Sequence, residues 1–199
     1  MHGIVLAAGS ATRMPNKALM PIAGGRLAIE SSLEFLRGLN TTVVVSKDSL
    51  IPHVLKMRGW KHLQYAVQPE PKGVVDAIKR VEFELACVTF CDNVYSMFEP
   101  RPHSPVATIR CSPNTDLDWH DGRQWCSRPK PESALAFAGW CVVQQHMLVR
   151  ESLIECFNIC NVQPQLVEEP WWDIGTTSEY ERYLKSAYKG LMHDDSYGV

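Results

Sequence analysis

The chain has 199 residues, with 20 lysines and arginines against 22 aspartates and glutamates and a formal net charge of −2 at pH 7. This length suits one domain with a sizeable core, and the near balance of charge excludes a sequence-wide basic field for nucleic acid or an anionic membrane. No apolar stretch approaches the roughly 20 residues of a membrane-spanning helix, and the first residues lack the pattern of a signal peptide.

The cysteines give an expectation about the compartment. There are seven, an odd number, and none has the CxxC spacing of zinc or redox motifs. Most lie in apolar runs, where buried free thiols explain them better than disulfides or a metal site. We therefore expect a protein of the reducing cytoplasm.

The N-terminal half alternates short apolar runs with helix-like stretches. Runs rich in β-branched and aromatic residues predict buried strands at Ile4–Leu6, Thr42–Val45, Leu63–Val67 and Val88–Phe90. Apolar residues three to four positions apart predict helices at Ala28–Leu39, Ser49–Arg58 and Val74–Leu85. Such alternation predicts an α/β fold, a three-layer αβα Rossmann-like domain with a mostly parallel mixed sheet. Ligands of such sheets bind beyond the carboxyl ends of the strands.

The second half has a different pattern, with fewer helices. It predicts strands at Val106–Arg110, Ala134–Val143 and Gln165–Glu168, and a hairpin over Asp118–Arg128 that turns at Asp121-Gly122. Helices are predicted at Gln145–Phe157 and Ser178–Leu191. We expect one domain over residues 1–192, followed by a disordered polar tail at 193–199.

The segment after the first strand has the composition of an anion-binding loop. The apolar run ends at Leu6 and is followed by the small residues Ala7, Ala8 and Gly9, then by two cations, Arg13 and Lys17. A loop poor in side chains lets backbone N–H groups approach a phosphate or a base. The segment matches neither GxxxxGK[ST] nor GxGxxG, and it indicates a loop that holds a nucleoside triphosphate.

Four segments in order resemble one enzyme family. They are MHGIVLAAGSATRMPNKALMPI (1–22), YAVQPEPKGVVDAI (65–78), TFCDNVY (89–95) and EPWWDIGTTSEYERYL (169–184), and SRPKPESALAFAGWCVV (127–143) is a weaker match. The first is similar to LAxGxGTRxxPxxxxPKxLxPI, the signature of the sugar-1-phosphate nucleotidyltransferases, such as glucose-1-phosphate thymidylyltransferase. The resemblance implies the fold of the nucleotide-diphospho-sugar transferases. One departure is Asn16, which stands where the family has proline before the lysine.

The resemblance implies a catalytic group of four residues. Asp92 and Asp173 match the two aspartates that hold the metal in the family, with Mg²⁺ as the expected cofactor. Arg13 matches the residue that clamps the leaving pyrophosphate, and Lys17 would neutralise phosphate charge as bonds change. Taken alone, Asp92 also suits a turn at a strand end, and Asp173 suits a position before a helix.

The resemblance also implies contacts for both substrates. The nucleotide would contact Leu6, Ala7, Ala8, Gly9, Gln68 and Gly73, with the Gln68 amide facing the edge of a pyrimidine. The acceptor side matches less well, because Ser127-Arg128-Pro129 replaces the family's Glu-Lys-Pro. We expect Arg128 to contact the acceptor phosphate, and Gly139 and Trp172 the acceptor itself, although a strand glycine can mark a kink and a tryptophan can pack under a sheet.

These motifs predict an enzyme that uses Mg²⁺ to transfer a nucleoside monophosphate from a nucleoside triphosphate, with a pyrimidine favoured, to a sugar-1-phosphate. Its expected partners are these two small molecules and neither nucleic acid nor a membrane, with an oligomeric state left between monomer and dimer. A first alternative is a cytidylyltransferase for phosphocholine or another small phosphate, with Trp140, Trp171 and Trp172 around a quaternary ammonium. A second is a non-catalytic nucleotide-binding regulator.

Overall fold

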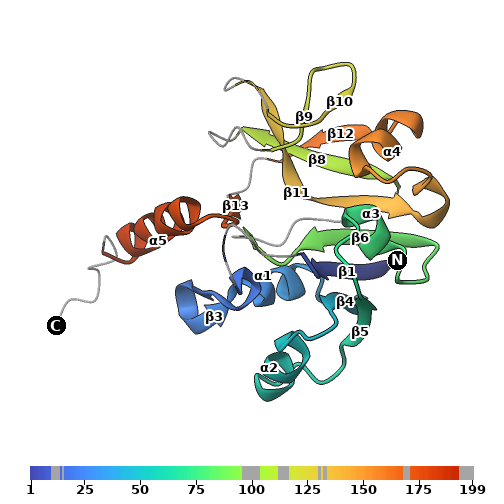
Figure 1. Cartoon of the computed structure of the whole chain (residues 1–199). Helices are drawn as coiled ribbons and strands as arrows, with labels where there is room; N and C mark the ends of the chain where they lie inside the picture. The colour runs from blue at the N-terminus through green and yellow to red at the C-terminus, as the bar shows by residue number, and fades with distance from the viewer. Residues whose placement is uncertain are drawn as a thin grey trace.

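A mixed β-sheet forms the centre of the computed structural model (Figure 1), which describes residues 1–9, 14, 16–95, 104–111, 117–129, 131, 134–167 and 171–192. Its parallel half has the order β6-β1-β4-β5. These strands are β1 (His2–Ala7), β4 (Asn40–Ser46), β5 (Gln64–Gln68) and β6 (Leu85–Phe90). All four strands predicted in the N-terminal half are confirmed, but the burial predicted for β5 is wrong: it is an edge strand, and Tyr65 and Val67 are exposed.

The other half of the sheet is mostly antiparallel and is built around the long strand β11 (Leu135–Gln144), which pairs with β6. The remaining strands are β8 (Val106–Cys111), β9 (Trp119–His120), β10 (Trp125–Cys126) and β12 (Gln163–Leu166). Strand β12 lies parallel to β8 at this edge. The predicted hairpin is confirmed: Asp121 Oδ1 accepts hydrogen bonds of 2.7 Å from the backbone N–H groups of Arg123 and Gln124.

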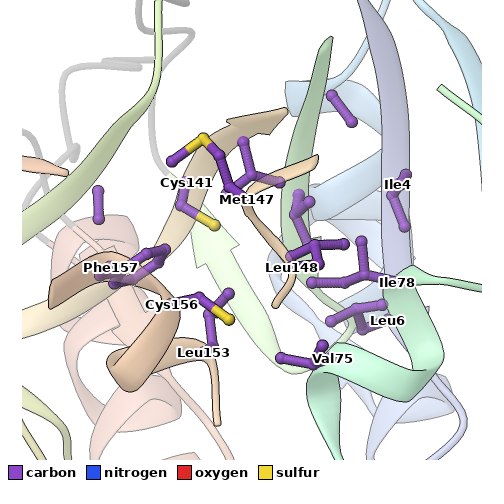
Figure 2. Packing of buried hydrophobic residues seen from close by; sticks show 14 of the residues in the cluster. Ile4, Leu6, Val75, Ile78, Cys141, Met147, Leu148, Leu153, Cys156 and Phe157 are labelled. Atoms are coloured by element: carbon purple, nitrogen blue, oxygen red, sulfur yellow. The ribbon is translucent and has the colours of Figure 1, made fainter. Parts of the chain in front are cut away.

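Helices cover both faces of the sheet, as the alternating pattern predicts. The covering helices are α1 (Ala28–Phe35), α2 (Ile51–Met57), α3 (Val74–Ile78) and α4 (Leu153–Ile159), and the last helix of the chain is α5 (Thr177–Met192). Helices α1 and α2 pack on the face that carries Val5 and Val43, whereas α3 and α4 pack on the face of Ile4 and Leu6. Figure 2 shows the second cluster, in which Leu6 and Ile4 lie near Val75 and Ile78 of α3.

Several predicted helices are shorter than expected, among them α1, which ends at Phe35 and not at Leu39. The stretch Val74–Leu85 is helical only to Ile78, because the chain must leave α3 and reverse before β6 begins at Leu85. The stretch Gln145–Phe157 contains a single 3₁₀ turn, η3 (Gln145–Met147), and α4 starts only after Ser152, whose Oγ accepts a 3.5 Å hydrogen bond from Glu155 N–H. Apolar spacing continues through both segments, so the pattern alone overestimates helix length.

Short elements complete the fold and carry part of the site. They are η1 (Lys17–Leu19), β2 (Pro21–Ile22), η2 (Ala23–Gly25), β3 (Arg26–Leu27), β7 (Asn93–Tyr95) and β13 (Trp171–Asp173). Strand β13 pairs antiparallel with β7, and α5 follows it as an arm beside the sheet (Figure 1). None of the helices in the described part of the chain is both long and apolar enough to cross a lipid bilayer. The cysteines described there are all free thiols.

Candidate active site

A cavity of about 1120 Å³ lies at the carboxyl edge of the parallel strands. It is lined by most of the residues that the sequence nominates: Leu6, Ala7, Ala8, Gly9, Lys17, Gln68, Gly73, Asp92, Arg128, Gly139 and Asp173. Segments from residue 6 to residue 173 therefore meet in one hollow. Arg13 lies outside the described residues, as do the other residues of the predicted loop from Ser10 to Pro15 except Met14.

The two aspartates come together because β13 pairs with β7, the strand that follows Asp92. Asp173 is opposite Asn93 in this pair, and Ile174 N–H donates a 2.9 Å hydrogen bond to Asp92 O. Gly175 lies between the carboxylates: a Cβ there would be 3.0 Å from Asp173 Oδ1 and 3.3 Å from Asp92 Oδ2. The carboxylate oxygens thus surround the same point, which only a residue without a side chain leaves open.

Lys17 brings an ammonium group to this pair and forms a salt bridge with Asp92. The lysine begins the 3₁₀ turn η1, and Asn16 before it has φ 55. Proline cannot adopt this φ, whereas asparagine tolerates it, so the departure from the family motif at residue 16 has a backbone reason. Burial is the largest single effect and lowers the pKa of Lys17, but the charge and the hydrogen bond of Asp92, together with Cys91 and Asp173, outweigh burial and raise this pKa. Lys17 is therefore cationic at neutral pH.

Lys17, Asp92 and Asp173 form a group that is called the charged cluster below. Within it, the ionised form of Asp173 is disfavoured. Burial, and then the negative charges of Asp92 and Glu179, raise the pKa of the Asp173 carboxyl to about 7. The backbone N–H of Gly175 donates a 2.9 Å hydrogen bond to Asp173 Oδ1 and partly offsets this effect. The charged cluster thus holds one positive and two potential negative charges, and it favours a further cation.

On the nucleotide side of the cavity, Gln68 is buried at the end of β5. Its Nε2 donates hydrogen bonds of 3.0 Å to Gly73 O and 2.8 Å to Asp76 Oδ2. Gly73 has φ 95, a conformation that favours glycine, and this turn directs its carbonyl toward Gln68 while α3 begins. The QPEPKG segment therefore forms one connected wall of the cavity.

On the opposite side, Gly139 interrupts the pairing of β11 with β8 between Phe137 and Cys141. It has φ 80, and a Cβ there would lie 2.7 Å from Asn93 Cγ and 2.8 Å from Trp171 Nε1. The glycine is the kink that a strand glycine often marks, and the space over it is filled by Asn93 and Trp171, which hydrogen-bond to each other. All three residues line the cavity.

The structure corrects the role expected of Trp172. Side chains alternate along β13, so Trp171 and Asp173 share the face that lines the cavity, and Trp172 has the other face. The Trp172 ring packs against Tyr183 of α5, with 6.1 Å between ring centroids. Trp140 is also in the core, against Phe35. Among the described residues, only Trp171 of these three tryptophans lines the cavity, and period-2 counting back from Asp173 could have selected it.

Other residues of the cavity wall were not nominated from the sequence. They belong to the loop after β4, to the segment before the β9–β10 hairpin, and to the start of α4: Ser46, Asp48, Ser49, Leu50, Ile51, Leu117, Asp118, Glu151, Ser152, Leu153 and Ile154. Asp118 Oδ1 accepts a 3.1 Å hydrogen bond from Arg128 N–H and thereby holds the segment of the expected phosphate contact. The loop after β4 could have been predicted to line the cavity, because it follows the carboxyl end of a strand that lies parallel to β1.

The N-terminal half of the chain matches the model of a known sequence family. Residues 3–97 match the model of the MobA-like NTP transferase domain. This part of the chain is therefore similar to the NTP transferases. No curated protein matches the chain at the sequence level.

Three solved structures have this fold over nearly the whole length of the chain. A Bacillus anthracis protein assigned as a glucose-1-phosphate thymidylyltransferase, in complex with sucrose, has a TM-score of 0.78 at 17% identity and covers 100% of this chain and 98% of its own. A UDP-glucose pyrophosphorylase complexed with UDP-glucose has a TM-score of 0.77 at 14% identity, covering 95% and 98%. A nucleoside-diphosphate-sugar pyrophosphorylase from Vibrio cholerae RC9 has a TM-score of 0.71 at 15% identity, covering 93% and 100%.

Proposed function

We propose that this chain is a nucleotidyltransferase, which uses Mg²⁺ to transfer a pyrimidine nucleoside monophosphate from its triphosphate to a sugar-1-phosphate, with release of pyrophosphate. The observation that carries the proposal is the charged cluster: Lys17, Asp92 and Asp173 meet at one point of a nucleotide-sized cavity. Nucleotidyl transfer brings several phosphate charges together, so such a site must supply cations and hold the reactants in line.

The residues fit a magnesium ion. Mg²⁺ is commonly held by one or two carboxylates, with substrate phosphates and water in its other positions. Asp92 and Asp173 offer such a pair around the space over Gly175, and burial together with the charges of Asp92 and Glu179 raises the pKa of Asp173, so a cation there would be favourable. When bound, the ion would neutralise phosphate oxygens and polarise the phosphorus that is attacked.

The other residues of the cavity would bind and orient the two substrates. Backbone groups of the Leu6–Gly9 segment would lie against the triphosphate, and Lys17, now paired with Asp92, would exchange that partner for a phosphate oxygen. Arg128, half exposed at the cavity wall, would contact the acceptor phosphate. In this proposal Arg13 keeps its role at the leaving pyrophosphate.

Support for the substrates comes from Gln68 and from the similar structures. An amide at the base edge suits a pyrimidine, and two of the similar structures are named for thymidylyl transfer and for UDP-glucose. The phosphocholine alternative needs several aromatic rings around a cation. Of the three tryptophans proposed for that cage, only Trp171 lines the cavity in the described part of the chain, so no observation favours this alternative.

The test is pyrophosphate release with Mg²⁺, with dTTP, UTP, CTP, GTP and ATP each combined with a panel of sugar-1-phosphates and phosphocholine, and with mass detection of the products. Asp92→Asn and Asp173→Asn should each lower kcat by about a hundredfold or more, whereas Glu181→Gln, an exposed position on α5, should leave it unchanged. Nucleotide binding without turnover on the whole panel would favour a regulator, and absence of both binding and turnover would refute the proposal.

A further inference from the structure

The orientation of the Gln68 amide is determined by its neighbours. Gly73 O and the Asp76 carboxylate, the two groups that contact its nitrogen at 3.0 and 2.8 Å, can only accept hydrogen bonds. A flipped amide would direct Oε1 at both of them, which is repulsive. The NH₂ group of Gln68 must therefore face Gly73 and Asp76.

This orientation leaves the Gln68 oxygen for a ligand. Gln68 is 4% exposed and lines the cavity, and within the part of the chain that the structure describes its Oε1 accepts no hydrogen bond. An acceptor that is accessible from the cavity can take a hydrogen bond from a ligand N–H group in place of water. The Gln68 side chain thus presents an acceptor to the cavity, while its own donors are used by Gly73 and Asp76.

Asp76 is itself held in place from the outer side. Arg80, one turn further along the chain, donates a 2.7 Å hydrogen bond to Asp76 Oδ1, while Asp76 Oδ2 accepts from Gln68. The two oxygens therefore have different partners, and only one of these partners belongs to the cavity wall. This separation allows the two interactions to be removed independently.

We propose that Asp76 is a positioning residue that presents Gln68 as an acceptor and thereby selects uracil or thymine as the base. Uracil and thymine carry an N3–H donor between two carbonyl groups, whereas N3 of cytosine is an acceptor and would face Gln68 Oε1 without a hydrogen between them. The inference rests on the proposed function, because it assigns the base that the same nucleotide site takes.

The decisive variant is Asp76→Asn, which keeps the shape of the side chain but adds an NH₂ donor. A flip of the Gln68 amide is then opposed only by Gly73 O, and the flipped amide offers its own NH₂ group to N3 of cytosine. For the wild type we expect kcat/KM with UTP or dTTP to exceed that with CTP by about tenfold or more, and we expect this ratio to fall by about fivefold or more in the variant. Arg80→Gln removes the outer ion pair and retains the Gln68 contact, so it should keep the wild-type ratio.

Two additions separate the possible outcomes. Asp76→Ala serves as a second variant, and calorimetry measures the binding of the same nucleotides. Asp76→Ala removes the carboxylate without adding a donor, so its ratio should lie between those of the wild type and Asp76→Asn. A wild type that prefers CTP, or ratios equal in all four proteins, would overturn the role of Asp76 and leave the proposed reaction intact. A wild type that binds no nucleoside triphosphate would instead overturn the proposed function together with this inference.

Discussion

Replacing Gly139 by alanine tests how β11 supports the charged cluster. The glycine has φ 80, and the space where a Cβ would stand is taken by Asn93 and Trp171. Asn93 follows Asp92 directly, and Trp171 shares its strand with Asp173. An added methyl group must therefore displace the two segments that carry the carboxylates.

The expected loss of stability has two parts. An alanine in the left-handed region costs about 1–2 kcal/mol. A methyl group forced against two packed side chains costs about 1–3 kcal/mol more. Gly139→Ala should thus lower the free energy of unfolding by about 2–5 kcal/mol, a large share of the roughly 5–15 kcal/mol that holds a typical domain together.

Gly38→Ala is the matched control, because Gly38 has φ 86 and no heavy atom within 4 Å of its Cβ position. It should show only the first part of the loss and keep full activity. Urea denaturation measures the stabilities, and pyrophosphate release measures kcat, which should fall by about tenfold or more for Gly139→Ala, since small displacements of catalytic groups slow a reaction strongly. Equal losses of stability in the two variants would refute the packing argument, and full activity in Gly139→Ala would refute its link to the site.

Two further predictions concern buried carboxylates. Without metal, the pKa of Asp173 is about 7 in the folded chain against an ordinary value of 3.8. The protonated carboxyl therefore contributes to the free energy of unfolding, fully below pH 3.8, and this contribution is lost as the pH rises to 7. Asp173→Asn should therefore exceed the wild type in free energy of unfolding by about 1–3 kcal/mol at pH 8, a gap that shrinks toward pH 4; urea titrations at several pH values that give a constant gap would contradict this. Glu30 accepts hydrogen bonds of 2.7 Å from Leu27 N–H, 2.8 Å from Arg58 Nε and 2.9 Å from Trp60 Nε1, which outweigh burial and lower the pKa of Glu30. Glu30→Gln replaces one of the two accepting oxygens by an NH₂ group that faces a donor, and it should cost about 2–4 kcal/mol at pH 7, where the carboxylate is ionised. Only the wild type should lose this stabilisation as the pH falls below 4.5, and acid melts of both proteins check the sign.

Much of the fold was predictable because it depends on local patterns. The runs Ile4–Leu6 and Val88–Phe90 are apolar over a length typical of strands, and both are central strands of the sheet. The helix ends were less predictable. Apolar spacing continues beyond Ile78 and through Gln145–Phe157, but the chain has to turn toward the next strand, and only packing decides where.

The candidate site was predictable as a set of residues and not as an arrangement. Motif resemblance nominated Lys17, Gln68, Asp92 and Asp173, and all four line one cavity. It nominated Trp172 in place of Trp171, because the resemblance identifies a segment, whereas the side chain that faces the ligand depends on the pairing of β13 with β7. Arg13, outside the described residues, stays a prediction.

The sequence by itself determined the alternation of strands and helices, the loop of small residues after β1, and the residue types that the chemistry needs. These follow from hydrophobic periodicity and side-chain chemistry, which act over a few residues. Only the tertiary structure decided that Lys17 pairs with Asp92, that Gly175 leaves room between two aspartates 81 positions apart in the chain, and that Asp76 turns the Gln68 amide. Such contacts join segments far apart in the chain, and their geometry depends on how the sheet packs as a whole.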